Sequence, residues 1–278
     1  MTSLPANRPS RRLGLVIDLD ICVGCHACAV ACKAWNTQTD GTVALADTDP
    51  YGAEPSGAWL NRIHSYEIEP ADIGQGAEAA RLIHFPKSCL HCEDAPCVTV
   101  CPTGASYKRE EDGIVLVNED ACMGCGLCAW ACPYGARELD PKAGVMKKCT
   151  LCVDRIYDET RPEEDRVPAC VRACPAGARA FGDLADPNSE ASRLSAARGG
   201  MDLMPEQGTK PVNRYLPPRS RDQGLPGPDT ALGGALGGVD LAALCGPAPA
   251  PQRSPGEPAP RGFLGWLDRA LERLETER

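Results

Sequence analysis

The chain has 278 residues with a net charge of −9, 43% hydrophobic residues, only 5% aromatic residues and 17 cysteines. The acidic balance and the scattered basic residues argue against non-specific nucleic-acid binding, which depends on basic surface. No stretch approaches the roughly 20 apolar residues that a membrane-spanning helix needs, so we expect no direct membrane span.

Residues 1–12 are predicted to be a short disordered arm. Ser10-Arg11-Arg12-Leu13 resembles the start of a twin-arginine export signal. Such a signal needs an apolar region of about 7–15 residues and a cleavage site. Here only residues 13–17 are apolar before Asp18, and cleavage would remove part of the cysteine run that follows. We therefore predict a cytoplasmic protein.

The first regular element expected is a strand over residues 13–18, because this stretch is apolar and partly β-branched. It leads into a C-x2-C-x2-C-x3-C run, the spacing of bacterial ferredoxins. Three thiolates of such a run ligate one cluster and the fourth ligates another, so each run needs a partner run. The first run consists of Cys22, Cys25, Cys28 and Cys32.

Residues 33–88 are interpreted as an insertion with strands over 61–68 and 81–85. The histidines in this part of the chain are interpreted as surface or packing residues, because cysteines already fill the ligand positions. They are His26, His64 and His84.

Two further runs follow, each ending in Cys-Pro. The second run is Cys89, Cys92, Cys97 and Cys101, and the third is Cys122, Cys125, Cys128 and Cys132. A hairpin is expected over 104–108 and 114–117, because Asp-Gly between extended segments is a strong turn signal. A second hairpin is expected over 136–139 and 145–148.

The fourth run is split by a long spacer and also ends in Cys-Pro. It consists of Cys149, Cys152, Cys170 and Cys174. A closing strand is expected over 178–182. The sequence Pro-x-Gly-Ala follows three of the runs, beginning at Pro102, Pro133 and Pro175, and this repetition indicates internal duplication.

The cysteine pattern stops after residue 183. We expect a helix over 188–198 and a proline-marked extended arm over 201–219. Residues 184–219 as a whole are interpreted as a partner-docking arm.

Residues 220–262 are rich in proline and glycine and are predicted to be a disordered linker. They contain Cys245, which we interpret as a free thiol. Residues 263–278 have an amphipathic helical period. Two interpretations of this helix remain open: it packs back on its own domain, or it is a tethered docking helix.

The spacing of the sixteen remaining cysteines favours iron–sulfur clusters over zinc or disulfides. Zinc sites commonly use separated C-x2-C pairs joined by longer spacers, whereas here three close cysteines precede a fourth and three runs end in Cys-Pro. Disulfides are disfavoured because there is no convincing export signal. We expect four [4Fe–4S] clusters.

Residues 13–219 resemble the four-cluster iron–sulfur subunits of the molybdopterin oxidoreductase superfamily, of the type found in dimethyl sulfoxide reductase. The resemblance implies an α+β fold of two nested bacterial-ferredoxin-like modules with short hairpins. The four-cluster domain would span 13–183. Its outer module would combine 13–32 with 149–183, and its inner module would be 89–148.

The resemblance also implies which cysteines share a cluster. Cluster 1 takes Cys22, Cys25, Cys28 and Cys174, and cluster 2 takes Cys89, Cys92, Cys97 and Cys132. Cluster 3 takes Cys122, Cys125, Cys128 and Cys101, and cluster 4 takes Cys149, Cys152, Cys170 and Cys32. Some relatives replace one ligand with tryptophan, but Trp130 is an additional residue here, so all four sites are complete.

Residues 16–36 and 204–219 resemble the branch of cytoplasmic, membrane-anchored sulfite dehydrogenases, although polysulfide, thiosulfate and tetrathionate reductase subunits share much of this sequence. The resemblance implies a non-catalytic subunit that passes electrons between a molybdopterin catalytic subunit and an integral, quinone-reactive membrane anchor. Lysines near the cluster cysteines are candidates for raising cluster potentials, namely Lys87, Lys147 and Lys148. A free-standing polyferredoxin and a zinc scaffold are the alternatives.

Overall fold

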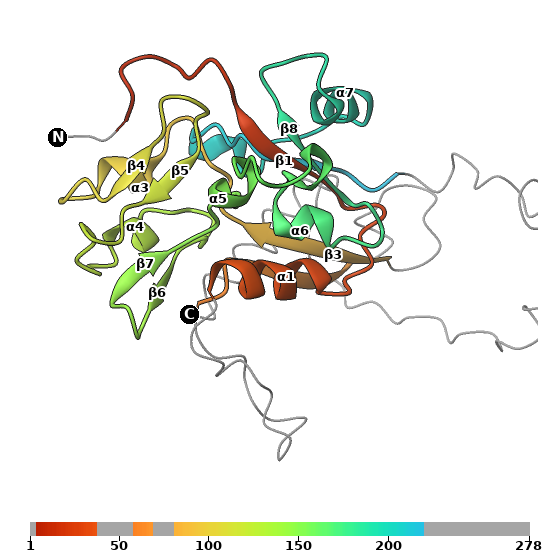
Figure 1. Cartoon of the computed structure of the whole chain (residues 1–278). Helices are drawn as coiled ribbons and strands as arrows, with labels where there is room; N and C mark the ends of the chain where they lie inside the picture. The colour runs from red at the N-terminus through yellow and green to blue at the C-terminus, as the bar shows by residue number, and fades with distance from the viewer. Residues whose placement is uncertain (1–3, 38–57, 69–80, 220–278) are drawn as a thin grey trace, which may run out of the picture. The chain divides into compact units, whose positions relative to one another are not determined.

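The computed structural model of the chain describes residues 4–37, 58–68 and 81–219 (Figure 1). Contacts group residues 1–68 and 80–218 into one unit. Within it, small sheets alternate with short helices, as the α+β prediction requires. The predictions for 220–262, with Cys245, and for 263–278 fall outside the described residues.

A three-stranded sheet joins strands from distant parts of this unit, of which Figure 1 labels β1 and β8. Strand β1 (Leu13–Asp18) pairs antiparallel with β8 (Arg179–Asp183) and parallel with β9 (Arg214–Leu216). All six residues of β1 are buried, because it is the middle strand. Helix α7 (Glu190–Ala197) packs on β8 and β1, and Ser189 caps its N-terminus by accepting a bond from Ser192 N.

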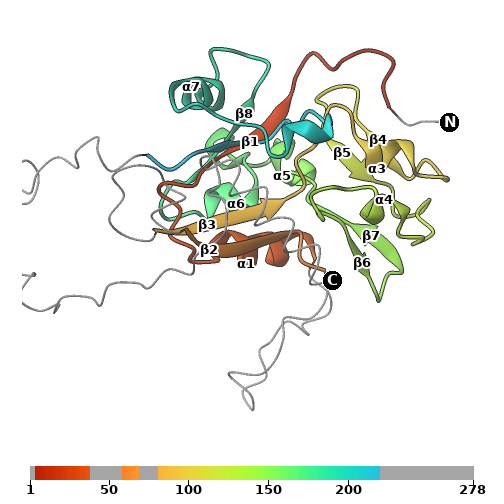
Figure 2. The same ribbon diagram turned by 180° about the vertical axis from the view of Figure 1, so that it is seen from behind.

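Strands β2 (Asn61–Ile68) and β3 (Arg81–Ser88) form an antiparallel ribbon next to helix α1 (Ala27–Asn36), as Figure 2 shows. β2 has the predicted bounds, but β3 continues past the predicted end at Phe85. Pro86 lies inside β3, opposite Ile63. A two-stranded ribbon has only edge strands, so a residue without an N–H is tolerated there.

Two small hairpins lie where the sequence predicts them, although each strand is short. Ser106–Lys108 (β4) pairs with Val115–Val117 (β5), and Glu138–Asp140 (β6) pairs with Val145–Lys147 (β7). Gly113 in the first turn has a φ of 73°, which suits the predicted Asp-Gly turn.

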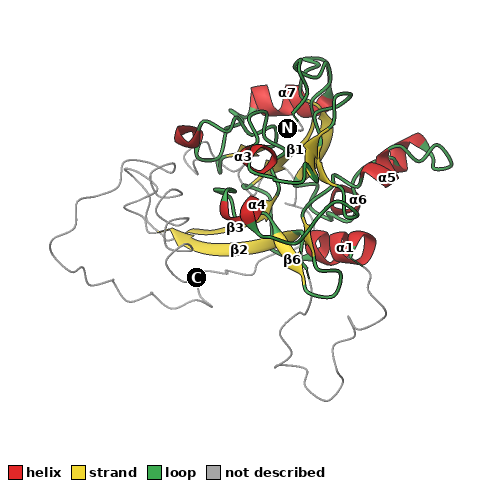
Figure 3. Cartoon of the chain, turned by 90° about the vertical axis from the view of Figure 1, so that its left-hand side faces the viewer, coloured by secondary structure: helices red, strands yellow, loops and turns green. Residues whose placement is uncertain are grey.

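Helices carry the third cysteine of each run. Beside α1, these are α3 (Pro96–Thr99), α4 (Leu127–Trp130) and α6 (Ala169–Arg172), while α5 (Val153–Ile156) and the 3₁₀ turns η1 (Glu163–Asp165) and η2 (Pro205–Gln207) lie in the connections. α1 contacts α6, and α3 contacts α4 (Figure 3). The first run therefore lies beside the fourth, and the second beside the third.

The stretch 201–219 is not simply an extended arm, because much of it packs into the unit. β9 belongs to the central sheet, and Leu203, Tyr215 and Leu216 are buried. The Tyr215 ring stacks on Phe85 with ring centroids 4.5 Å apart, and its hydroxyl donates to Pro86 O at 2.9 Å. The aromatic pair anchors this stretch, and a docking role for 184–219 stays a prediction.

The described part of the N-terminal arm has no regular secondary structure, but it is not without contacts. Arg8 and Arg12 both bind the carboxylate of Glu93, which belongs to the second cysteine run. These ion pairs hold the arm against the domain immediately before β1 begins.

Candidate metal centres

Three cavities in the described part of the chain are each lined by four cysteines, and each set combines two runs. The first is lined by Cys22, Cys25, Cys28 and Cys174, the second by Cys89, Cys92, Cys97 and Cys132, and the third by Cys101, Cys122, Cys125 and Cys128. These are the sets expected at clusters 1, 2 and 3.

The fourth set comes together around Cys32. Burial raises the pKa of the Cys32 thiol, and nearby Cys149, Cys170 and Cys152 raise it further by repulsion between thiolates. Asn36 Nδ2 lies 3.7 Å from Cys32 Sγ and 3.6 Å from Cys152 Sγ, so one amide bridges the two runs. In the described part of the chain, cysteines of the first run thus lie near those of the fourth, and cysteines of the second run lie near those of the third. The assignment of these ligands to four clusters stays a prediction.

Glycine is required at the C-x-G-C turns for a steric reason. Gly24 and Gly124 have φ of +66° and +68°. A Cβ on Gly24 would lie 2.4 Å from the His84 ring, and one on Gly124 would lie 2.3 Å from Gly144 O. These contacts are too short for any side chain, so each loop closes tightly around its cavity only with glycine.

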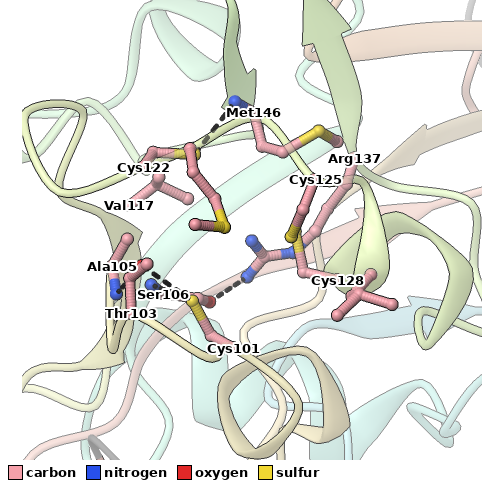
Figure 4. Close-up of a pocket in the computed structure, with 12 residues that line it drawn as sticks. Cys101, Thr103, Ala105, Ser106, Val117, Cys122, Cys125, Cys128, Arg137 and Met146 are labelled. Atoms are coloured by element: carbon pink, nitrogen blue, oxygen red, sulfur yellow. Dashed lines mark hydrogen bonds between the residues drawn. The ribbon is translucent and has the colours of Figure 1, made fainter.

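Backbone N–H groups point at several of the sulfur atoms. Met146 N lies 3.4 Å from Cys122 Sγ (Figure 4), and Ser106 N and Ala178 N lie 3.3 Å from Cys101 Sγ and Cys174 Sγ. N–H donors stabilise thiolate sulfur and influence cluster potentials. The hairpins after the runs therefore supply donors as well as structure.

The four sets differ in burial. Cys25 and Cys125, of the first and third runs, are exposed, whereas the cysteines expected at cluster 4 are all buried. Burial raises the pKa of Cys92 and of Cys149 to about 12. Thiolates at these positions need a compensating positive charge, and a bound metal provides it. Cys89 lies close enough to Cys149 to contribute to the shift, so the expected cluster 2 and cluster 4 sites adjoin.

Two buried arginines at these sites were not singled out from the sequence. Arg137 donates to Cys97 Sγ at 3.0 Å, and Arg179 is 4% exposed beside the first cavity. Although burial opposes its charge, the thiolates of Cys170 and Cys28 raise the pKa of Arg179 above its ordinary value. The signal was present in the sequence, because both arginines directly follow Gly-Ala in a Pro-x-Gly-Ala repeat.

The lysines proposed to raise cluster potentials, and the histidines interpreted as packing residues, differ in burial and in their partners. Lys148 is buried and donates to Cys149 O at 2.6 Å, whereas Lys147 pairs with Glu119. His84 accepts from or donates to Ser65 Oγ at 2.9 Å, which agrees with a packing role. His91 was not singled out from the sequence. It is fully buried between Cys89 and Cys92, and burial lowers its pKa well below the usual value.

Among the described residues, no three His, Cys, Asp or Glu side chains converge on a single metal-ion position. The thiols instead surround cavities, which is the arrangement that a multi-atom cluster needs. None of the described helices is long and apolar enough to cross a membrane.

Paired cysteine runs of this kind define a dicluster ferredoxin-type electron carrier. Two family models agree: a 4Fe-4S dicluster domain matches residues 80–184, and another 4Fe-4S dicluster domain matches residues 21–105. The chain is therefore a protein with 4Fe–4S clusters.

Similar proteins narrow the class further. The chain is 57% identical over 208 residues to a sulfite dehydrogenase subunit of Allochromatium vinosum, covering 75% of this chain and 84% of that protein. It is 37% identical over 210 residues to a tetrathionate reductase subunit of Salmonella typhimurium, covering 75% and 73%. It is 36% identical over 208 residues to a polysulfide reductase polypeptide of Wolinella succinogenes, covering 75% and 95%.

The chain belongs to the family of iron–sulfur electron-transfer subunits of molybdopterin oxidoreductases, together with this sulfite dehydrogenase subunit. Membership of this family implies a catalytic partner subunit.

Proposed function

We propose that this chain carries four [4Fe–4S] clusters and passes electrons from a molybdopterin subunit that oxidises sulfite to a quinone-reactive membrane anchor. The observation that carries the proposal is the grouping of cysteines from paired runs around separate cavities. Each bound cluster would supply a one-electron site. The ligand sets are those given above for clusters 1 to 4.

The packing supports a definite order of the four sites. Sites 1 and 4 share the α1–α6 pair, sites 2 and 3 share the α3–α4 pair, and Cys149 of site 4 lies near Cys89 of site 2. Exposed Cys25 and Cys125 lie at sites 1 and 3. The order 1–4–2–3 therefore has surface sites at both ends, where a donor and an acceptor subunit can each approach.

Sulfite is proposed as the substrate of the partner because of the 57% identity to the sulfite dehydrogenase subunit of Allochromatium vinosum. Oxidation of sulfite to sulfate consumes one water and releases two protons and two electrons. The electrons would cross this subunit singly, because each site accepts one. We place the complex on the cytoplasmic side of the membrane, as the resemblance to cytoplasmic, membrane-anchored sulfite dehydrogenases implies.

A deletion strain tests the substrate. Loss of the gene is expected to cause sulfite to accumulate during growth on reduced sulfur, and the intact gene should restore turnover. Unchanged sulfite turnover with lost growth on dimethyl sulfoxide, polysulfide or tetrathionate would contradict sulfite oxidation and favour a reductase complex. The identities of 37% and 36% to reductase subunits make this the second candidate.

Affinity purification tests the partners. The tagged chain is expected to co-purify from detergent extracts with a large molybdopterin protein and an integral membrane protein. Recovery of the chain alone, with its clusters intact, would instead indicate a free-standing polyferredoxin.

A further inference from the structure

Two arginines occupy the same place in the internal repeat. Arg137 follows Cys132 by five residues, and Arg179 follows Cys174 by five residues. Both side chains are buried, at 5% and 4% exposure. The equivalent position after Cys101 holds Ser106, so the inner module contains one such arginine.

Arg137 lies between the two cavities of the inner module. It lines both the cavity of site 2 and the cavity of site 3. Its Nη2 donates to Cys97 Sγ at 3.0 Å and to Ser106 Oγ at 2.7 Å. Figure 4 shows its guanidinium among Cys101, Cys122, Cys125 and Cys128.

Arg179 has the corresponding place in the outer module. It lines the cavity of site 1, and its charge also acts on Cys170 and Cys149 of site 4. Its Nη2 donates to Asn61 Oδ1 at 2.9 Å, which fixes the guanidinium on strand β2. One positive charge thus adjoins both sites of each module.

Both guanidiniums have N–H groups that donate no hydrogen bond among the described residues. Nε and Nη1 of Arg137, and Nη1 of Arg179, are buried without a hydrogen-bond partner among the described residues. A buried donor without a partner is destabilising, and more so when the group is charged. Sulfur atoms of a bound cluster are the acceptors that would satisfy these donors.

We propose that Arg137 and Arg179 set the reduction potentials of the cluster pairs 2–3 and 1–4, an inference that rests on the proposed cluster function. Reduction adds one negative charge to a cluster. A fixed buried positive charge and N–H donors to sulfur stabilise that reduced state. Each arginine adjoins two sites, so it raises the potentials of both members of its pair.

The test is a redox titration of the purified full-length chain, followed by electron paramagnetic resonance. Arg137→Gln is expected to lower the potentials of clusters 2 and 3, and Arg179→Gln those of clusters 1 and 4. Each reduction potential should fall by more than about 59 mV. For a one-electron couple, this fall corresponds to a tenfold change in the oxidised-to-reduced ratio at fixed potential. Spectra of Cys25→Ser and Cys125→Ser identify the signals of clusters 1 and 3.

Two control variants test whether burial of the charge and the planar arrangement of donors matter. Arg172→Gln removes an exposed charge from α6, where the side chain is 65% exposed and pairs with Asp165. The reduction potentials of Arg172→Gln should differ from those of the wild type by less than this tenfold change in ratio, because exposed charges are screened by salt. Arg137→Lys keeps the buried charge but not the planar fork of donors, and should shift the potentials less than Arg137→Gln.

Iron and sulfide analysis distinguishes failure of this inference from failure of the proposed function. Gln variants with full cluster content and wild-type potentials would overturn the inference, as would equal shifts in Arg172→Gln. Loss of clusters in both Gln and Lys variants would also overturn it, because the arginine would then serve assembly alone. A wild-type chain without iron and sulfide would contradict the proposed function itself.

Discussion

At the scale of single residues, twelve cysteines and two buried arginines, Arg137 and Arg179, line three cavities of the described domain. The runs were sufficient to single out sixteen candidate thiols, because ligand spacing is a local property of the chain, and their grouping into clusters stays a prediction. The roles of Arg137 and Arg179 could not be predicted in the same way. Whether a guanidinium is buried between two cavities depends on strand partners that lie far away in the sequence.

The crossed fourth ligand gives the first prediction. Cys22→Ser and Cys174→Ser should perturb the same paramagnetic signal, because both thiols line one cavity. Cys125→Ser, which lines another cavity, is the control and should perturb a different signal. Distinct signals for Cys22→Ser and Cys174→Ser would mean that the nested pairing is wrong.

The tight turn at Gly24 gives the second prediction. Gly24→Ala combines a φ of +66° with a Cβ 2.4 Å from the His84 ring, whereas Gly126→Ala has a φ of +76° and no atom within 4 Å. Backbone strain alone costs roughly 1–2 kcal/mol. Calorimetry should therefore show a larger fall in unfolding temperature for Gly24→Ala than for Gly126→Ala.

Removing the clash is the control for this second prediction. Adding His84→Ala to Gly24→Ala should recover part of the lost unfolding temperature. Equal destabilisation by Gly24→Ala and Gly126→Ala, with no recovery, would show that the close approach to His84 is unimportant.

Among the elements, local pairings were easier to predict than distant ones. Both small hairpins were predicted, because each turn and its flanking strands are adjacent in the sequence. The parallel pairing of β1 with β9 was not predicted, since the two strands are joined through almost the whole domain. The stretch containing β9 was consequently interpreted as an arm, although Leu216 and Tyr215 are completely buried.

Asn213 joins these distant elements and gives the third prediction. Its Oδ1 accepts from Leu15 N at 2.8 Å and its Nδ2 donates to Cys89 O at 3.0 Å, in a fully buried position. Asn213→Ala leaves both backbone groups unpaired, at about 1–3 kcal/mol each. The unfolding temperature of the holoprotein should fall by roughly 5–15 °C.

The control for Asn213→Ala is Arg193→Ala, an exposed position on α7 where alanine is a good helix former. It should change the unfolding temperature by little. A similar small change in Asn213→Ala would show that the bridge between β1 and the second run is dispensable.

The molecule as a whole has few large apolar side chains with which to build a core. Only 5% of its residues are aromatic, and the described domain is divided into small sheets and short helices. Three buried cysteines, Cys89, Cys92 and Cys97, line one cavity inside the described domain, where a conventional core would have packed apolar side chains. Sequence composition indicated this dependence on bound clusters, but it could not show how the two modules are packed.

This dependence gives the fourth prediction. Removal of iron by a chelator under oxidising conditions should abolish cooperative thermal unfolding, because metal binding and folding are coupled in such sites. Circular dichroism and calorimetry on the same sample would measure the loss. An iron-free chain that still unfolds cooperatively at the holoprotein's temperature would show that the protein core is sufficient by itself.

The most direct test of the whole account is the metal and sulfide content of the anaerobically purified chain. Four [4Fe–4S] clusters predict about sixteen iron and sixteen acid-labile sulfide ions per chain, with several reducible paramagnetic species. Stoichiometric zinc with little sulfide would contradict the account.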